Sequence, residues 1–236
     1  NAQALVEMVE RIALRKGFGD ILADGTKRAS ERIGRGSSEC AIHVKGVELP
    51  MHEPRYKQGM GLHYSIHASG ADHCSGVMDD LVQKNQVKWE TLPTTELSRR
   101  KAQMLYEVGL WRHIGNYIGM CIFVPWSHQQ IAEAVEAVTG WPMGSQPLAD
   151  VVERGMTLAR IFNLREGISR VDDKLPRRFF DSPLEGPLKD ISVDSAKLEM
   201  AQRDYYQILG WNEAGIPTHE KLVELNIEWA YGYIKK

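Results

Sequence analysis

The residue types that could do chemistry are concentrated in one stretch, residues 45–74. The polar, reactive side chains that are dense here include His52, Glu53, Arg55, His63, His67, Asp72, His73 and Cys74. Six glycines and prolines lie between them, and such residues let the backbone turn sharply or approach a bound group closely. A segment that only joined two helices would not need both kinds of residue. We therefore predict a site-forming loop, a short helix over 58–68, and a second loop that ends at His73.

His73 is the first candidate for a catalytic residue. It follows Gly70-Ala-Asp, which predicts a turn whose backbone can come close to a ligand. A histidine titrates near neutral pH, so it can give or take a proton during a reaction. The alternative is a histidine that is hydrogen-bonded to backbone inside a packed loop. Spacing alone favours that alternative, because a lone histidine defines no chemistry.

Cys121 is the second candidate, at the end of Asn116-Tyr-Ile-Gly-Met-Cys121 and before the apolar run Ile122-Phe-Val. The commonest role of a free cysteine is that of a small buried apolar side chain. The other interpretation is one thiolate ligand of an iron–sulfur cluster, which usually needs four thiolates. The chain has no Cys-x-x-Cys, and Cys40 and Cys74 are not at cluster spacing. Cys121 could therefore contribute to a cluster only together with cysteines from elsewhere. In that case Ile122, Phe123, Val124 and Trp126 are expected to shield the cluster from water.

Two further pairs in the same region have other interpretations. His63 and His67 lie four residues apart on a predicted helix, a spacing that can share a metal. No Glu follows His63, so this is not a metalloprotease motif, and we expect the pair to form one helix face bordering the site. Cys74 and His73 could form a nucleophile pair, but adjacent residues in a turn usually point apart.

Charged residues outside these pairs are interpreted as structural. Glu53 and Arg55 are expected to brace the loop by an ion pair rather than to react. A second charged group is predicted to form either a solvated face or a clamp between segments. Its members are Arg165, Glu166, Arg170, Asp172 and Asp173.

Length and composition limit the possible classes of protein. With 236 residues the chain can bury the core of one large domain or two small ones. A net charge of -2 provides no strong field for nucleic acid or an anionic membrane. No apolar run approaches the roughly 20 residues of a membrane span, and no secretory signal is present. Three separated cysteines favour a reducing compartment, and the start at Asn1 suggests a fragment of a longer protein.

Start and stop signals predict helices almost throughout the chain. The expected helices cover 2–16, 20–33, 58–68, 94–117, 127–140, 147–167, 194–209 and a short segment from 218. Their predicted caps are Asn1, Asp20, Asp194, Thr218 and a capping box at Ser127-His-Gln-Gln130, with Pro147 at a first helical position. A strand over 41–44 has no obvious partner, and 168–193 is expected to be a long functional or interface loop.

These elements indicate an all-α protein, an irregular multi-helix bundle rather than a solenoid. If residues 1–236 divide into two subdomains, the composition places the boundary near 75–93.

Several motifs in order along the chain carry a family resemblance. They are Val44-Lys-Gly-Val-Glu-Leu-Pro50, Glu53-Pro-Arg55, Gly70-Ala-Asp-His73, Asn116-Tyr-Ile-Gly-Met-Cys121, Phe162-Asn-Leu-Arg-Glu-Gly167, Asp172-Asp-Lys-Leu-Pro-Arg-Arg-Phe179, Gly210-Trp-Asn and Gly215-Ile-Pro217. Together they resemble the C-terminal helical domains of the tungsten-containing aldehyde ferredoxin oxidoreductases. The resemblance implies oxidation of an aldehyde with water to a carboxylate at a tungsten or molybdenum bis-pterin centre. Electrons would then pass through a 4Fe–4S cluster to ferredoxin.

The resemblance also implies roles for individual residues. The family's histidine at this motif lies beside the tungsten and is implicated in proton transfer, which assigns that role to His73. Cys121 would be one cluster ligand, with the other three cysteines upstream of this sequence. Asn116, Gly119 and Met120 belong to the same cofactor-binding motif. The family usually has Asp where this chain has Asn116, so the expected pterin contact would lack a charge.

The resemblance further implies the partners and the setting. The partners would be an N-terminal pterin-binding domain of the same protein, ferredoxin, a small aldehyde and, in one arrangement, a second copy of the chain. The setting would be the cytoplasm of an anaerobe, and residues 1–236 alone are expected to be inactive.

Two alternatives to aldehyde oxidation stay open. Related proteins reduce an aromatic acyl-CoA thioester, and Ser69-Gly-Ala-Asp is compatible with that branch. A non-catalytic helical interaction module is the third interpretation.

Overall fold

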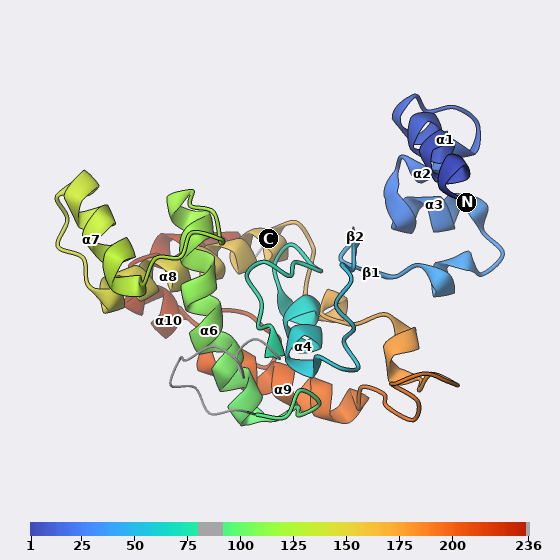
Figure 1. Ribbon diagram of the computed structural model, residues 1–236. Coiled ribbons are helices and arrows are strands. Elements are labelled where there is room, and N and C mark those ends of the chain that lie inside the picture. The colour runs from blue at the N-terminus through green and yellow to red at the C-terminus, as the bar shows by residue number, and fades with distance from the viewer. Residues whose placement is uncertain (80–91, 235–236) are drawn as a thin grey trace.

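The structure is a computed structural model that describes residues 1–79 and 92–234 (Figure 1). Its α-helices are α1 (Ala2–Ala13), α2 (Phe18–Leu22), α3 (Gly25–Ile33), α4 (Gln58–Ile66), α6 (Arg99–Ile118), α7 (His128–Thr139), α8 (Ser145–Arg165), α9 (Ser195–Ile208) and α10 (His219–Glu224). Four 3-10 helices complete the helical part: η1 (Ser37–Cys40), η2 (Arg170–Asp172), η3 (Arg177–Phe180) and η4 (Glu228–Tyr233). The expected all-α class is confirmed. Among the described residues, none of the helices is both long and apolar enough to span a bilayer.

The N-terminal segment differs from the prediction in one respect. Asn1 caps α1 as expected, because its side chain accepts hydrogen bonds from the Gln3 and Ala4 amides. The prediction of a single helix over 20–33 was wrong, since a turn at Ala23 and Asp24 separates α2 from α3, which begins at Gly25 with φ +83°. Asp20, the predicted cap, instead lies inside α2.

The expected isolated strand is one half of a hairpin. β1 (His43–Val44) pairs antiparallel with β2 (Val47–Glu48), so the prediction that it lacks a partner was wrong. Lys45 and Gly46 form a two-residue connection in which both have positive φ, the backbone of a type I′ turn. That turn was missed because Lys is an uncommon residue at such a φ.

The later helices follow their capping signals closely. The capping box at Ser127, the stop at Gly140 and the caps Asp194 and Thr218 are all confirmed. α6 begins later than predicted, after the N-cap Ser98. α8 begins at Ser145, so Pro147 is its third residue rather than its first. The expected apolar stripe of α7 is also shorter, since Val138 is 87% exposed.

The core lies around α4, in which every residue is buried between α6 and α9 (Figure 1). α4 has no capping side chain of its own. Asp79 caps it from a distance by accepting hydrogen bonds from the Gly59 and Met60 amides. The same carboxylate pairs with the buried ammonium of Lys101 at 2.5 Å, which joins α4 to α6.

Smaller apolar clusters extend this core. One joins α6, α7 and α8, and another joins α8, α10 and η4. The helices α1–α3 lie apart from the remaining helices in Figure 1 and connect through η1 and the hairpin. The main cluster contains residues from both sides of 75–93, part of which lies outside the described residues, and a subdomain boundary there stays a prediction.

Candidate functional site

His73 lies in the loop that follows α4, where Gly70 fixes the backbone. Gly70 has φ +91°, and a Cβ at this position would lie 2.2 Å from the Val44 carbonyl oxygen, so only glycine fits. His73 is partly exposed, and its ring centroid is 5.2 Å from that of His52. The loop therefore presents His73 beside a second imidazole.

Asp72 holds the loop in shape. Its carboxylate accepts hydrogen bonds from the backbone amides of Cys74 and Ser75, both at 3.0 Å, and from the Ser75 hydroxyl. Burial opposes ionisation of Asp72, but these hydrogen bonds outweigh burial and hold its pKa well below the usual range. The site thus keeps one carboxylate charged next to several histidines.

Cys74 and His73 do meet, contrary to the prediction that adjacent residues point apart. The Cys74 Sγ lies 3.8 Å from the His73 Nε2. Burial and the nearby Asp72 charge both raise the pKa of the Cys74 thiol, which keeps it protonated. A protonated thiol is a poor nucleophile, so the contact does not favour a nucleophile pair.

The expected brace of the preceding loop is confirmed. Arg55 pairs with Glu53 through two bonds of 2.9 Å, from Nε and from Nη2 to the two carboxylate oxygens. Arg55 also donates to the Asp181 carbonyl and lies over the Phe179 ring at 5.6 Å. The ion pair therefore attaches the site loop to the segment around η3.

Behind this loop lie His63, His67 and His113, which we call the inner histidine cluster. His63 and His67 come from α4 and its C-terminal end, and their ring centroids are 4.7 Å apart. His113 comes from α6, and its Nε2 is 3.3 Å from the His67 Nε2. Burial lowers the pKa of all three imidazoles, that of His67 to about 4, so they are neutral at neutral pH.

The inner histidine cluster forms one wall of a cavity of about 260 Å³. Its other walls come from α6, α8, α9 and the loop after α4, and they include Ser69, Asn116, Tyr117, Met156, Arg160 and Trp211. Asn116 is exposed on α6 and adds an uncharged amide to this lining. The cavity therefore combines an apolar surface with imidazole, amide and guanidinium groups.

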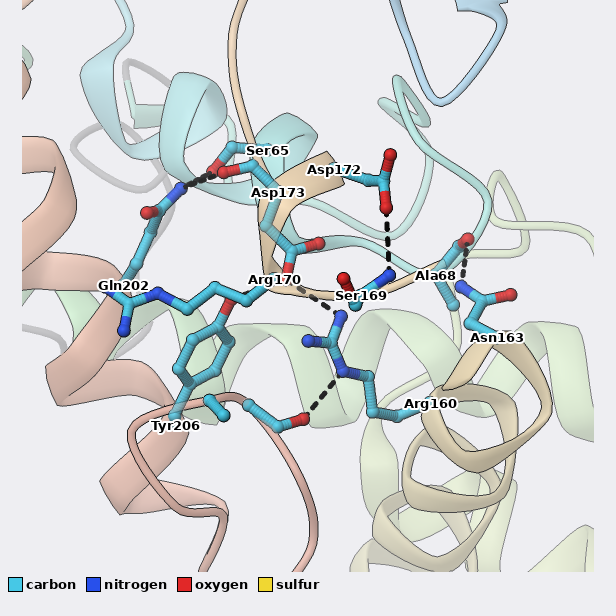
Figure 2. A network of polar contacts seen from close by, with 12 residues as sticks. Ser65, Ala68, Arg160, Asn163, Ser169, Arg170, Asp172, Asp173, Gln202 and Tyr206 are labelled. Carbon is cyan, nitrogen blue, oxygen red and sulfur yellow. Dashed lines mark hydrogen bonds and ion pairs between the residues drawn. The ribbon is translucent and has the colours of Figure 1, made fainter. Parts of the chain in front are cut away.

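A buried ionic network supports the cavity from the other side. Asp173 is fully buried and contacts the Lys45 ammonium and the Arg160 guanidinium, each at 2.8 Å. Figure 2 shows Arg160 and Tyr206 directed at Asp173, and the Tyr206 hydroxyl donates to its carboxylate at 2.5 Å. This network clamps the hairpin, α8, the long loop and α9 together.

The contacts of Arg165, Glu166, Arg170 and Asp173 show which of these charged residues clamp segments together and which form a solvated face. Asp173 and Arg170 act as a clamp, since Arg170 donates to the Glu213 carbonyl and pairs with Glu199. Arg165 and Glu166 instead form an exposed pair on the surface. Both interpretations therefore apply, to different members of the group.

The motif that ends at Cys121 lies at the C-terminal end of α6. Gly119 ends the helix with φ +72°, and the Met120 amide donates to the Gly115 carbonyl at 2.8 Å. Cys121 then begins a non-helical segment, and its thiol is free and exposed. The expected shielding by Ile122, Phe123 and Trp126 is not made within the described chain, where these side chains are exposed.

The comparisons with known proteins agree with these motifs. The family profile described as aldehyde ferredoxin oxidoreductase, domains 2 and 3, matches residues 1–227. The chain belongs to the aldehyde ferredoxin oxidoreductase family. It is 31% identical over 236 residues to the tungsten-containing aldehyde ferredoxin oxidoreductase of Pyrococcus furiosus, covering 98% of this chain and 38% of that protein. The chain thus spans little more than a third of the relative's length.

Other relatives give the same result. The chain is 30% identical over 233 residues to the tungsten-containing aldehyde ferredoxin oxidoreductase of Pyrococcus horikoshii, covering 97% of this chain and 37% of that protein. It is 27% identical over 246 residues to an aliphatic sulfonate oxidoreductase, WOR-like subunit, of Pyrococcus furiosus, covering 99% of this chain and 36% of that one.

A solved structure has the same fold. The active site complex BamBC of benzoyl coenzyme A reductase with 1,5-dienoyl-CoA matches with a TM-score of 0.69 and 23% identity, over 97% of this chain and 39% of that one.

Several residues of the site were not identified from the sequence. His113 lies on the same buried face of α6 as Leu105 and Gly109, at a spacing of four residues. Helical periodicity could therefore have predicted that His113 is buried. Lys45 and Arg160 had no such signal. Lys45 lies more than 100 residues along the chain from Arg160 and Asp173, and buried charges are identified only once their partners are known.

Proposed function

We propose that this chain is the C-terminal helical part of an oxidoreductase that oxidises an aldehyde with water to a carboxylate and passes the two electrons to ferredoxin. The observation that carries the proposal is the family match over residues 1–227. A tungsten or molybdenum bis-pterin centre and a 4Fe–4S cluster, when bound, supply the two-electron chemistry. The pterin-binding part belongs to the longer protein, which we place in a reducing cytoplasm.

His73 is proposed to accept a proton from the reacting substrate. It is partly exposed at the tip of a loop that Gly70 and Asp72 fix, so its ring can reach a bound molecule. Its neighbour His52 offers a second imidazole for the same proton. Conversion of an aldehyde and water to a carboxylate releases three protons together with the two electrons, and a group that accepts a proton is therefore needed.

The Cys121 segment fits one ligand of a cluster. Its thiol is exposed, free and held at a helix end, whereas a buried packing cysteine would be enclosed. One thiolate cannot hold a cluster, and the other ligands would come from the longer protein. Asn116 and Gly119 fit a pterin edge through an amide and backbone, without the charge of the family's usual aspartate.

The experiment compares His73→Asn with His128→Asn in the full-length protein, purified without oxygen. His128 is an exposed histidine on α7 that stacks on Trp111, so it controls for the loss of an imidazole. We expect His73→Asn to lower aldehyde oxidation by roughly 10²–10⁴, the usual contribution of general acid–base catalysis, with metal content unchanged. Equal activity of the two variants would reject the role of His73.

The same preparation separates the alternative functions. The substrates are a set of aldehydes, an aromatic acyl-CoA thioester and an aliphatic sulfonate, the last two chosen from the names of related proteins. Turnover of aldehydes alone supports the proposal, whereas selective turnover of the thioester or the sulfonate replaces it. A full-length protein free of tungsten, molybdenum and iron would favour a helical interaction module.

A further inference from the structure

The inner histidine cluster has several side chains that can bind a metal ion, and the role proposed for His73 uses none of them. His63 and His113 are almost fully buried, at 3% and 6% exposure, and the ring centroids of His67 and His113 are 5.4 Å apart. Asp72 closes the group, because the ligand atoms of His63, His67 and Asp72 all lie within 4.8 Å of one another. Two imidazoles and a carboxylate therefore converge between α4 and the following loop, and His113 of α6 lies against one of them, with its Nε2 3.3 Å from the His67 Nε2.

The separations suit a small tetrahedral metal ion. Bonds of about 2.0–2.1 Å place neighbouring ligand atoms of a tetrahedral zinc ion about 3.3 Å apart. The Nε2 atoms of His67 and His113 are 3.3 Å apart. The ligand atoms of His63, His67 and Asp72 lie within 4.8 Å of one another, so binding of the ion would draw these side chains, and His113 with them, closer together.

His63 provides the second, independent observation. Its Nε2 is buried, and among the described residues it has no hydrogen-bond partner. Buried polar atoms in folded proteins nearly always have a partner, so an orphan of this kind points to a bound group. Gly76 leaves room for this imidazole, since a Cβ there would lie 2.6 Å from the His63 Cδ2.

The Nδ1 atoms of His113 and His67 have hydrogen-bond partners, as the second ring nitrogen of a metal-bound histidine usually does. The His113 Nδ1 donates to the Gly109 carbonyl at 2.7 Å, which leaves the lone pair on Nε2. The His67 Nδ1 is 2.9 Å from the Ser69 hydroxyl. Asp72 is oriented by two backbone amides and still has free lone pairs.

The alternative to a metal ion is a hydrogen bond from His67 to one of its neighbours, and it explains less of the geometry. The His67 Nε2 could donate to the His113 Nε2 while its Nδ1 accepts from Ser69. The Ser75 hydroxyl, 3.4 Å from the same His67 nitrogen, could also take part. Both arrangements satisfy His67 and leave the His63 Nε2 without a partner.

We propose that His63, His67 and Asp72 bind one Zn²⁺ ion and that His113, beside His67, completes its coordination. Neutral imidazoles and a carboxylate are ligands that zinc accepts, and a fourth protein ligand makes a closed, structural site. The ion joins α4, the loop that carries His73, and α6, and it fixes one wall of the cavity. This assignment revises our expectation of a simple helix face, and it does not depend on the proposed redox activity.

The experiment measures zinc in the full-length protein after treatment with EDTA and titration with zinc sulfate. We expect one zinc per chain by elemental analysis, with X-ray absorption showing nitrogen and oxygen neighbours at about 2.0 Å. His63→Leu and His67→Leu should each lose this equivalent, with zinc binding at least ~10²-fold weaker. The control His128→Leu, which removes an exposed imidazole elsewhere, should retain it.

Thermal unfolding with and without EDTA separates zinc loss from misfolding. In EDTA, His63→Leu should melt at or above the wild-type temperature, because leucine removes an unpaired buried nitrogen. Zinc should then raise the melting temperature of the wild type and the His128→Leu control only. The proposal is overturned if the wild type takes up no equivalent of zinc, or if the His63 and His67 variants take up as much as the control.

Discussion

Asp173 is a single buried carboxylate between two buried cations, Lys45 and Arg160. Asp173→Asn keeps the shape but leaves both cations without a counter-charge, and breaking a buried pair costs about 3–5 kcal/mol. We expect that loss in the free energy of unfolding measured by urea denaturation. The control is Glu166→Gln, which breaks an exposed pair and should cost less than about 1 kcal/mol. A similar effect of both substitutions would mean that water screens Asp173.

The inner histidine cluster predicts how stability depends on pH. Above an unfolded pKa of about 6.5, both folded and unfolded chains hold these imidazoles neutral. Below it the unfolded chain binds protons that the folded chain excludes, because burial lowers the folded pKa values. The free energy of unfolding should therefore fall as pH falls from about 6.5 to 4, by on the order of 3 kcal/mol for His67 alone.

Urea denaturation between pH 7.5 and 4.5 tests this dependence, with His67→Gln as the comparison. The variant removes one of the titrating groups, so its slope over this range should be smaller. Asp72 does not confuse the result, because its lowered pKa makes its own effect appear only below about pH 4. A slope that is the same in both proteins would contradict the assignment.

At the scale of elements, local signals predicted helix ends well and long-range contacts poorly. Ser127, Asp194 and Thr218 cap helices within three residues of themselves, so sequence alone identifies them. Asp79 caps α4 from about 20 residues away, and no local pattern marks it. The same limit applies to the site, where the His73 loop was predicted and the third imidazole, His113, was not.

Gly70 is the element-scale test, because it joins the hairpin to the His73 loop. Gly70→Ala adds a Cβ 2.2 Å from the Val44 carbonyl at a positive φ. Left-handed strain of about 1–2 kcal/mol and overpacking of about 1–3 kcal/mol should then add. Gly34→Ala is the matched control, since Gly34 also has positive φ but has open space around its Cβ position.

The expected result is a loss of roughly 2–5 kcal/mol for Gly70→Ala and about 1–2 kcal/mol for Gly34→Ala in the free energy of unfolding. The difference between them measures the close approach of the loop to the hairpin. If the two losses were equal, the contact with Val44 would have no energetic role.

At the scale of the whole molecule, two apolar surfaces of the described chain are exposed. One is the face of α1 with Leu5 and Val9, and the other follows α6 with Phe123 and Trp126. The sequence predicted Phe123 and Trp126 to shield Cys121, but Phe123 is 86% exposed. The hydrophobicity of these side chains is evident from the sequence, whereas the described chain does not show what covers them. The chain spans little more than a third of the length of its relative from Pyrococcus furiosus.

The three cysteines test the cluster assignment at this scale, because each serves as a control for the others. Cys40 and Cys121 are both exposed, and Cys74 is partly buried, so exposure alone does not single out Cys121. Only Cys121 follows the left-handed helix end at Gly119 and precedes an apolar segment that a partner domain can cover. A cluster needs such a dry environment and nearby amides to set its potential.

In the full-length protein, Cys121→Ala should therefore lose or degrade the 4Fe–4S signal and stop electron transfer to ferredoxin. Cys40→Ala and Cys74→Ala should keep the cluster, with a loss of stability of at most about 1 kcal/mol. Iron content and the low-temperature paramagnetic resonance spectrum of the three reduced variants provide the comparison. An intact cluster in Cys121→Ala, or loss of the cluster in either of the other variants, would contradict the assignment of Cys121 as the thiolate ligand that this chain supplies.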